Sequence, residues 1–187
     1  MESVGMENGI CKQVAARPEI RSSFFHLAQK VFGLSFEGWY EAGYWSESYQ
    51  PYAWVEEGRV VANVSVNRID LTWQGEPRRY IQLGTVMADP QYRGRGHARR
   101  LMETVLEEWR GRCDALYLFA NRTVLDFYPK FQFVRAAERQ YTLPLRPCAR
   151  GCRRLDMKRE EDRAALLAHY RRSNPYSAFP MVGNGGF

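Results

Sequence analysis

The sequence predicts an α/β (α+β) fold in which a mixed central sheet is flanked by helices. Three observations lead to this prediction. Apolar residues recur at helical spacing over residues 18–33, they alternate with polar residues over 60–67, and a strand, a helix and a second strand follow one another over 79–120. A unit of the last kind joins two parallel strands through a right-handed crossover. With 187 residues, the chain is long enough to form one complete hydrophobic core.

The first helix is expected over residues 18–33, because Pro18 suits a first turn and Gly33 suits an end. A second helical stretch is expected from Phe36 to about Tyr49. It interleaves acidic and aromatic residues, among them Glu37, Trp39, Glu41, Tyr44 and Trp45. One interpretation is a helix that packs large rings on a sheet. The other is an aromatic and acidic wall for a cationic ligand, since rings and carboxylates both attract cations.

Strands are expected next. Residues 52–55 and 60–67 form a predicted hairpin around a tight turn at 56–59. After Asn67 the apolar residues move from even-numbered to odd-numbered positions, which predicts a β-bulge there. Residues 79–88 form a third strand, and the continuously apolar residues 116–120 form a strand covered on both faces. The helix between them buries the stripe that begins at Ala98.

The remaining chain is expected to hold a short helix over 123–128, cut by Pro129, and extended structure over 131–145. A helix over about 157–171, capped by Asp156, precedes a final loop. We therefore divide the chain into a domain of residues 1–146 and a helical and loop extension of residues 147–187. That extension would be the start of an incomplete further segment.

Charge and hydropathy limit the function classes. The net charge is +6, and the basic residues gather in 90–112 and 146–172, which suits either nucleic acid or a small polyanion. The longest apolar run, residues 115–120, is far shorter than the ~20 residues of a membrane span. The N-terminus lacks the pattern of a secretory signal. We expect a cytoplasmic protein without membrane contact, whose four cysteines are free thiols.

The segment 88–101 carries the clearest chemistry, because it joins the end of a strand to the start of a helix. Such a junction leaves backbone N–H groups unpaired, and the helix dipole adds partial positive charge. Gly94 and Gly96 have no side chains to block an anion, while Arg93 and Arg95 supply full charges. The implied ligand is a diphosphate.

Alternative phosphate ligands fit less well. No Gly-Lys-Ser or Gly-Lys-Thr triplet of a P-loop occurs, and Arg99 stands where a dinucleotide fingerprint needs its third glycine. An arginine-glycine segment that binds nucleic acid would be repeated, whereas here a single copy opens an amphipathic helix. We therefore expect no nucleic-acid partner.

The run Arg93-Gly94-Arg95-Gly96-His97-Ala98 resembles the acyl-CoA pyrophosphate loop of the GNAT N-acetyltransferase superfamily, Gln/Arg-x-x-Gly-x-Gly/Ala. A second match lies downstream in the family's order. The pattern Asn-x-x-Ala-x-x-Leu/Phe-Tyr-x-x-x-Gly-Phe is matched by Asn121, Val124, Phe127, Tyr128 and Phe133. The resemblance covers roughly residues 10–145 and points to a bacterial member.

The resemblance implies a mostly antiparallel sheet, splayed at the acyl-CoA site, and acetyl-CoA (coenzyme A) as cofactor. The residues it assigns to the cofactor are Val86, Met87, Ala88, Arg93, Gly94, Arg95, Gly96, His97, Ala98 and Asn121. The amides of 93–98 would hold the pyrophosphate, residues 86–88 would lie beside the pantetheine like an added strand, and Asn121 would hydrogen-bond the arm. Tyr128 would be catalytic, donating to the departing sulfur.

The resemblance further implies transfer of an acetyl group from acetyl-CoA to a primary amine by direct attack in a ternary complex. For a small, cationic acceptor we assign Glu37, Trp39, Glu41, Tyr44 and Trp45. The base stays unassigned, because Gln82 stands where histone-type relatives carry a glutamate; Glu37, Glu41, Asp70, the chain terminus and a water relay are candidates.

The alternative function is a non-catalytic acyl-CoA-binding regulatory module, suggested by Gln82, by Gln132 in place of a glycine, and by the short tail. We assign no metal, since His26 and His169 lack partners at ligand spacing. The sequence leaves the acceptor's identity and the oligomeric state open, a homo-oligomer included.

Overall fold

The computed structural model describes residues 8–137, 142, 144 and 153–172. Its centre is a five-stranded sheet in the order β1-β2-β3-β4-β5. The strands are β1 (Gly9–Cys11), β2 (Tyr49–Glu56), β3 (Arg59–Trp73), β4 (Glu76–Ala88) and β5 (Ala115–Leu118). The first four pair antiparallel, and β5 pairs parallel with β4. This mixed, mostly antiparallel sheet confirms the predicted fold class.

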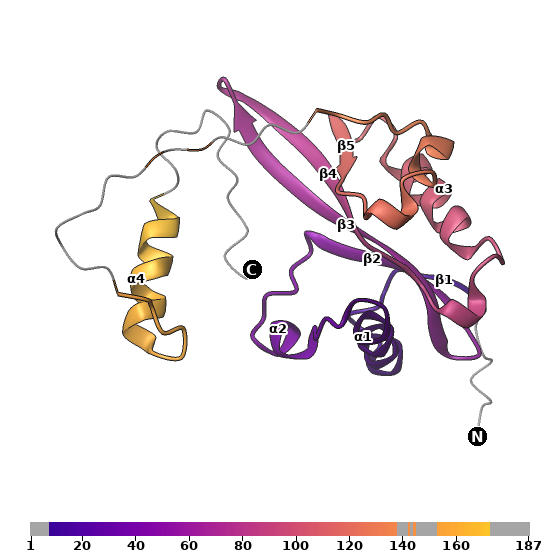
Figure 1. The fold of residues 1–187 in the computed structure, drawn as a ribbon, viewed down its shortest axis with the longest axis horizontal. Coiled ribbons are helices and arrows are strands. Elements are labelled where there is room, and N and C mark those ends of the chain that lie inside the picture. Colours follow the sequence, from indigo (N-terminus) through magenta and orange to yellow (C-terminus); the bar gives the residue numbers. More distant parts are fainter. Residues whose placement is uncertain (1–7, 138–141, 143, 145–152, 173–187) are drawn as a thin grey trace.

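Helices cover the two faces of the sheet unequally (Figure 1). One face carries α1 (Pro18–Phe32) and α2 (Glu37–Glu41), and the opposite face carries α3 (His97–Trp109). Three short 3-10 helices link the elements: η1 (Pro90–Tyr92), η2 (Arg122–Val124) and η3 (Tyr128–Phe131). A fourth α-helix, α4 (Glu160–Arg171), lies away from the sheet (Figure 1).

Several predicted elements are confirmed. Helix α1 ends where expected, and the N–H of Gly33, in the left-handed region at φ +68°, donates to the carbonyl of Gln29 at 2.9 Å. The β2–β3 hairpin turns through Glu57 and Gly58, both at positive φ. Strands β4 and β5 flank α3 as the predicted parallel unit.

Other predicted elements are corrected. Helix α2 ends at Glu41, and Tyr49 already belongs to β2, because Gly43 turns left-handed at φ +76° and the following residues return to the sheet. The bulge predicted near Asn67 is wrong, since β3 pairs with β4 without interruption from Ser65 to Trp73. The helix expected over 123–128 is replaced by η2 and η3.

The C-terminal predictions are only partly covered. Helix α4 begins at Glu160, later than expected, and Asp156 Oδ1 accepts a hydrogen bond from the Lys158 amide at 2.9 Å in the turn before it. Residues 133–137 have no regular secondary structure. Most of 138–152 and all of the predicted loop 173–187 lie outside the described residues, so the boundary at residue 146 stays a prediction.

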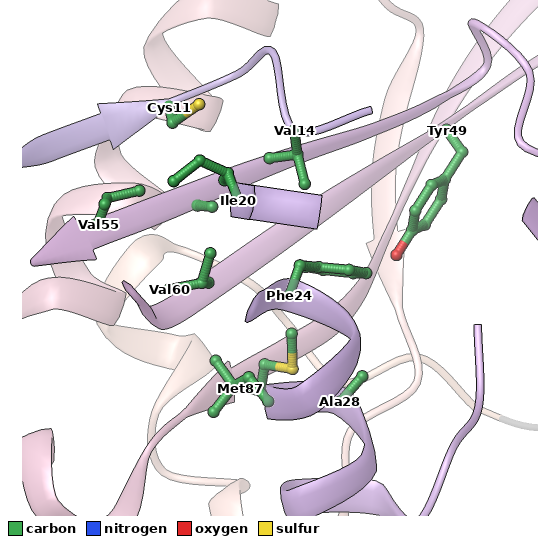
Figure 2. Close-up of a cluster of buried hydrophobic side chains, with 11 residues drawn as sticks. Cys11, Val14, Ile20, Phe24, Ala28, Tyr49, Val55, Val60 and Met87 are labelled. Atoms are coloured by element: carbon green, nitrogen blue, oxygen red, sulfur yellow. The ribbon is translucent and has the colours of Figure 1, made fainter. Parts of the chain in front are cut away.

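Two apolar clusters form the core. Figure 2 shows the cluster between α1 and the sheet, where Phe24 and Ala28 meet Val60 and Met87. The second cluster packs α3 against the other face through residues such as Leu101. The prediction that β5 is covered on both faces is wrong, because α1 packs on β3 and β4 and the residues of β5 are exposed or half-buried.

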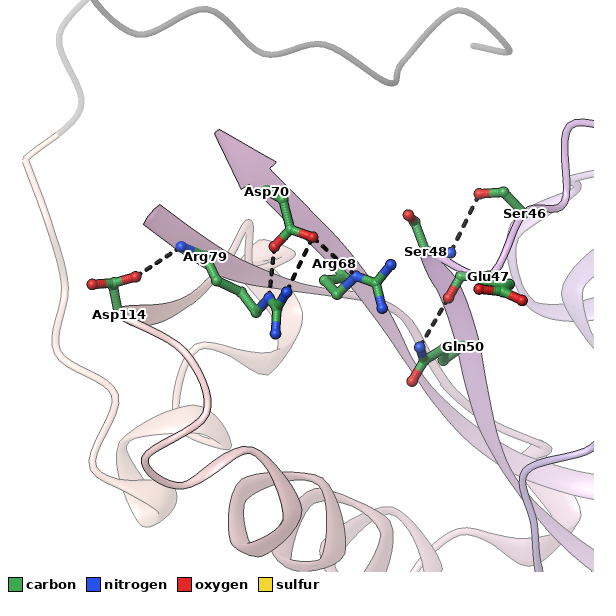
Figure 3. Close-up of polar contacts among 8 residues, drawn as sticks. All are labelled: Ser46, Glu47, Ser48, Gln50, Arg68, Asp70, Arg79 and Asp114. Atoms are coloured by element: carbon green, nitrogen blue, oxygen red, sulfur yellow. Dashed lines mark hydrogen bonds and ion pairs between the residues drawn. The ribbon is translucent and has the colours of Figure 1, made fainter. Parts of the chain in front are cut away.

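An ion pair and a hydrogen bond hold together the far end of the β3–β4 hairpin and the start of β5 (Figure 3). Arg79 Nε donates to Asp70 Oδ1 at 2.6 Å, and the Arg79 amide donates to Asp114 Oδ2 at 2.7 Å. Exposed pairs of this kind add little stability. They do hold the junction of β4 and β5, which pair from Tyr80 and Ala115 to Leu83 and Leu118.

Among the helices in the described part of the chain, none combines the length and apolar character of a membrane span. Within the same residues, no cluster of three or more His, Cys, Asp or Glu is placed to hold a metal ion. Cys11 and Cys113 are free thiols, as expected, whereas Cys148 and Cys152 lie outside the described residues.

Candidate functional site

The loop between β4 and α3 is anchored at its first residue, Asp89. The Asp89 amide donates to the Val61 carbonyl at 2.8 Å, and Asp89 Oδ1 accepts from the Gln91 amide at 3.0 Å. Lys30 Nζ of α1 lies 2.8 Å from Asp89 Oδ2 and, as the largest cause, holds the pKa of that carboxyl below its usual range. The loop therefore leaves the sheet from a fixed point.

Two glycines shape the rest of the loop. Gly94 and Gly96 have φ of +81° and +83°, and no atom lies within 4 Å of the position that a Cβ would take on either. Backbone conformation, and not lack of space, is therefore what requires glycine here. Successive amides in such turns point into one concave surface, which suits an anion.

The amides of this loop are free. None of the N–H groups of Gly94–Arg99 donates a hydrogen bond to another described residue, and the first helical bond runs from the Arg100 amide to the Gly96 carbonyl at 3.0 Å. These donors sit at the N-terminus of α3, where the helix dipole adds positive charge. The arrangement can bind a diphosphate by its main chain.

Beyond Asp89, the side chains around the loop are mainly basic, with the carboxylate of Glu56 among them. Arg95 lies over the Tyr92 ring at 4.6 Å and within 3.7 Å of Glu56 Oε2. The His97 ring stacks on Trp54 at 4.8 Å, and its Nε2 lies 3.0 Å from Glu56 Oε1, which is an ion pair when the imidazole is protonated. The His97 side chain is thus engaged with β2, so only its backbone is available to a ligand in the loop.

Strand β4 carries a bulge just before the loop. Gly84 pairs with Ser65 and Met87 pairs with Asn63, so Thr85 and Val86 together face the single residue between those partners. Met87 is buried in the α1 cluster, whereas Val86 and Ala88 pack against the α3 cluster. The three residues assigned to the pantetheine therefore turn their side chains to both faces of the sheet.

Tyr128 lies in the α3 cluster with its residue 8% exposed. Its ring packs edge-on against Phe127 at 5.3 Å and near Phe133 at 6.2 Å. The hydroxyl forms no hydrogen bond with any described residue, and burial raises the pKa of the phenol above its ordinary value. Tyr128 is therefore a protonated donor whose hydrogen is free.

The second sequence match departs from the family pattern at Pro129 and Gln132, and the structure shows the conformation of each. Pro129 stands at the start of η3 and does not end a helix. Gln132 adopts φ +67°, and its amide donates to the Pro129 carbonyl at 3.0 Å, so it takes the left-handed conformation that a glycine adopts readily. Asn121 Oδ1 accepts from the Thr123 amide at 3.3 Å, which caps η2.

The residues assigned to the acceptor are placed differently from one another. Trp45 packs against Phe24 at 5.6 Å and Tyr49 at 5.0 Å, and Trp39 packs beside it, so both indoles belong to the α1 cluster. Tyr44 is 46% exposed. The carboxylate residues of α2, Glu37 and Glu41, are exposed.

Sequence reasoning missed a polar group beside the bulge. Asn63 and Ser65 lie at the polar positions of an alternating strand, which predicts exposure, yet both residues are fully buried. They contact Tyr49 and Thr85 through hydrogen bonds. The sequence did hold a signal for this burial. The long helical region before the strand can cover the second face of the sheet, and a strand that is covered on both faces buries its polar residues as well.

The bulged strand β4 runs into an amide-lined helix N-terminus, the kind of site that an acyl-CoA-dependent transferase needs for the diphosphate of its cofactor. The chain belongs to the GNAT family: residues 15–136 match the family described as acetyltransferase (GNAT) domain. It is an acetyltransferase of this class. No match to a curated protein is found.

Solved structures share the fold. An acetyltransferase from Trypanosoma brucei is 23% identical, with a TM-score of 0.57, over 74% of this chain and 100% of its own. Glucosamine-6-phosphate N-acetyltransferase from Arabidopsis thaliana is 17% identical, with a TM-score of 0.58, over 73% and 98%. A predicted acetyltransferase from Clostridium acetobutylicum, solved with acetyl-CoA, is 14% identical, with a TM-score of 0.58, over 73% and 96%.

GNAT acetyltransferases use acetyl-CoA, and the residues present here fit that cofactor. The free amides of Gly94–Arg99 match the two phosphates in both charge and hydrogen-bonding need. The bulge lies in β4, which leads into this loop, and Tyr128 packs in the cluster that includes buried residues of α3, the helix that follows the loop.

Proposed function

We propose that this protein transfers the acetyl group of acetyl-CoA to a primary amine of a small, cationic acceptor by direct attack in a ternary complex. The observation that carries the proposal is the row of unpaired amides of Gly94–Arg99 at the start of α3. The name of the glucosamine-6-phosphate N-acetyltransferase that shares the fold supports a small acceptor. The sequence resemblance supports a bacterial origin.

Bound acetyl-CoA supplies an activated thioester, and the residues of the chain bind and orient it. The loop amides would hold the pyrophosphate, Arg93 and Arg95 would neutralise its charge, and the backbone of residues 86–88 would align the pantetheine. Asn121 keeps its amide nitrogen for the arm while its oxygen caps η2.

Tyr128 would donate a hydrogen bond to the departing sulfur. Complete transfer of a proton from a phenol of ordinary pKa near 10 to a thiolate of pKa near 8.5 costs about 2 kcal/mol of free energy. Burial raises the pKa of Tyr128 further, which increases that cost. A shared hydrogen bond that stabilises the developing negative charge is therefore favoured over complete proton transfer.

The acceptor must attack as a free amine. For an amine with a lysine-like pKa, deprotonation at pH 7 costs roughly 4.6 kcal/mol. Asp70 is a poor base, because Arg79 lowers its pKa and holds it on the outer hairpin. Gln82 carries an amide, which cannot take the proton. With these two set aside, Glu37, Glu41, the chain terminus and a water relay are the candidates for this step.

Calorimetry with coenzyme A and acetyl-CoA, together with thiol release over a panel of small amines, tests the proposal. We expect both ligands to bind and at least one amine to be acetylated. The variant Tyr128→Phe is expected to lose about tenfold or more in turnover, because a donor to the developing charge is removed, while its affinity for coenzyme A stays unchanged.

Phe127→Leu serves as the control, since it changes a neighbouring ring without touching the hydroxyl. Absence of binding by coenzyme A would refute the proposal. Binding without thiol release for any amine would replace it with the non-catalytic acyl-CoA-binding module.

A further inference from the structure

A buried hydrogen-bonded network lies beside the β4 bulge. Asn63 and Ser65 are fully buried and Tyr49 is 7% exposed. Asn63 Nδ2 donates to Ser65 Oγ at 2.8 Å, Ser65 Oγ donates to the Tyr49 hydroxyl at 2.9 Å, and that hydroxyl lies 3.0 Å from Thr85 Oγ1. The network therefore connects three strands to the residue at the centre of the bulge.

The amide of Asn63 sets the direction of the first two hydrogen bonds of this network. An amide nitrogen can only donate, so Ser65 must accept from it and pass its own single hydrogen to Tyr49. Tyr49 then accepts from Ser65. Between Tyr49 and Thr85 either oxygen can donate, and donation by Tyr49 is the arrangement that gives the hydrogen of this buried phenol an acceptor. Burial raises the pKa of Tyr49 to about 12, which keeps this phenol protonated.

Thr85 is the last residue of this hydrogen-bonded network, and its hydroxyl can donate one further hydrogen bond. In that arrangement its oxygen accepts from Tyr49, and its own hydroxyl hydrogen is available to a ligand, since Thr85 Oγ1 contacts no described residue other than Tyr49 through a hydrogen bond. The residue is half-buried, unlike the other members of the network, so the hydroxyl stands where the network meets the surface. A polarised chain of donors strengthens its last donor.

The backbone of Thr85 is strained into place. Its φ is +48°, in the left-handed region that β-branched residues rarely adopt. The network holds it from two sides, because Asn63 Nδ2 also donates to the Thr85 carbonyl at 2.9 Å. Strain maintained by buried groups on both sides is typical of a functional position.

We propose that the Thr85 hydroxyl donates a hydrogen bond to the acetyl carbonyl oxygen of bound acetyl-CoA. Tyr49, which Ser65 and Asn63 hold in place, is the positioning residue that orients this hydroxyl. This inference rests on the proposed function, because it takes the pantetheine to lie along residues 86–88, which directly follow Thr85. The donor acts on the one oxygen that distinguishes acetyl-CoA from coenzyme A.

That difference gives a test that needs no knowledge of the acceptor. The dissociation constants of acetyl-CoA and coenzyme A are measured by calorimetry for the wild type, Thr85→Val, Thr85→Ser and Tyr49→Phe. Valine keeps the shape of threonine without the hydroxyl, and serine keeps the hydroxyl. Thr85→Val should bind acetyl-CoA roughly three- to tenfold more weakly, the range of one lost hydrogen bond, and coenzyme A unchanged.

Thr85→Ser should retain the wild-type preference for acetyl-CoA over coenzyme A. Tyr49→Phe should lose part of this preference while its affinity for coenzyme A stays unchanged. Unchanged coenzyme A affinity also shows that each variant is folded at the site. If Thr85→Val does not fold, Tyr49→Phe decides the question, because it leaves Thr85 intact. The quantity to compare is again the ratio of the dissociation constants of acetyl-CoA and coenzyme A.

Equal weakening of both ligands would show a merely structural role and overturn the inference, as would unchanged binding of both. Failure of Thr85→Ser to keep the preference would also overturn it. If the wild type binds neither ligand, the proposed function itself fails. If the wild type binds both but Thr85→Val behaves like it, only the role of Thr85 fails.

Discussion

The loop before α3 and the aromatic segment from α2 to β2 were both predicted as binding surfaces, and the structure builds them in opposite ways. In the loop, the amides of Gly94–Arg99 have no partner among the described residues. In the aromatic segment, Trp39 and Trp45 are packed against Phe24 and Tyr49. The comparison teaches that residue type alone does not indicate a site: the loop keeps donors available to a ligand, whereas the two indoles of the aromatic segment are engaged in packing.

The largest expected effect tests the aromatic side of this comparison. Trp45→Ala should lower the free energy of unfolding by about 3 kcal/mol, since it removes a large ring from the α1 cluster. Chemical denaturation measures this. Tyr44→Ala, at an exposed ring, should cost less than about 1 kcal/mol. A Trp45→Ala protein of unchanged stability that no longer acetylates amines would make this segment an acceptor wall instead.

The next effect tests the loop. Gly96→Val should weaken coenzyme A binding by about tenfold or more, because a branched residue at φ +83° costs of order 1–3 kcal/mol and distorts the amides. Titration calorimetry measures the change. Gly111→Val is the matched control, since Gly111 has φ +68° beyond the other end of α3. Equal losses in the two variants would mean that strain, and not the loop, governs binding.

A third prediction concerns the anchor of the loop and its pH dependence. The Lys30 ammonium lowers the pKa of Asp89, so this pair stabilises the fold above the unfolded pKa of about 3.9 and stops doing so as pH falls through the lower folded value. Asp89→Asn should therefore cost up to about 1 kcal/mol at pH 7 and progressively less below pH 4.

Denaturation of this variant at pH 7 and pH 3 measures the difference, with Asp126→Asn as an exposed control. A cost that is the same at both pH values would contradict the role of the Asp89 charge.

The smallest expected effect sharpens the electrostatics of the loop. Glu56 lies near Arg95 and His97, where it opposes an anion. Glu56→Gln should therefore raise coenzyme A affinity by roughly two- to threefold at low salt, with less gain at high salt. Glu57→Gln, at the neighbouring turn residue, should change little. Weaker binding by Glu56→Gln would show that holding Arg95 and His97 in place matters more than the charge.

Local patterns predicted the parts of the fold that short-range physics controls. Helical spacing and a terminal glycine located α1, and alternation around a tight turn located the β2–β3 hairpin. The glycines of the loop were predictable because a strand-to-helix junction with two left-handed residues needs them. The free amides follow from the same junction, since a helix start has no earlier turn to bond with.

Other features depend on contacts between distant residues. The aromatic stretch predicted as a helix to Tyr49 is shorter, because β3 pairs with Tyr49 and draws it into the sheet. The position of the bulge was predicted wrongly. The alternation of apolar residues reports which side chains are buried, and it does not report the register between two strands. Asn63 and Ser65 look like surface positions in sequence, and only the covering of that face by α1 and α2 buries them.

The sequence by itself determined the loop, its glycines and the strand–helix–strand unit around it, because these obey rules that act over a few residues. Only the tertiary structure decided where β4 bulges, which polar groups that bulge collects and which rings are used up in packing. Those outcomes depend on pairing and burial between segments tens of residues apart, and no local pattern encodes the partner.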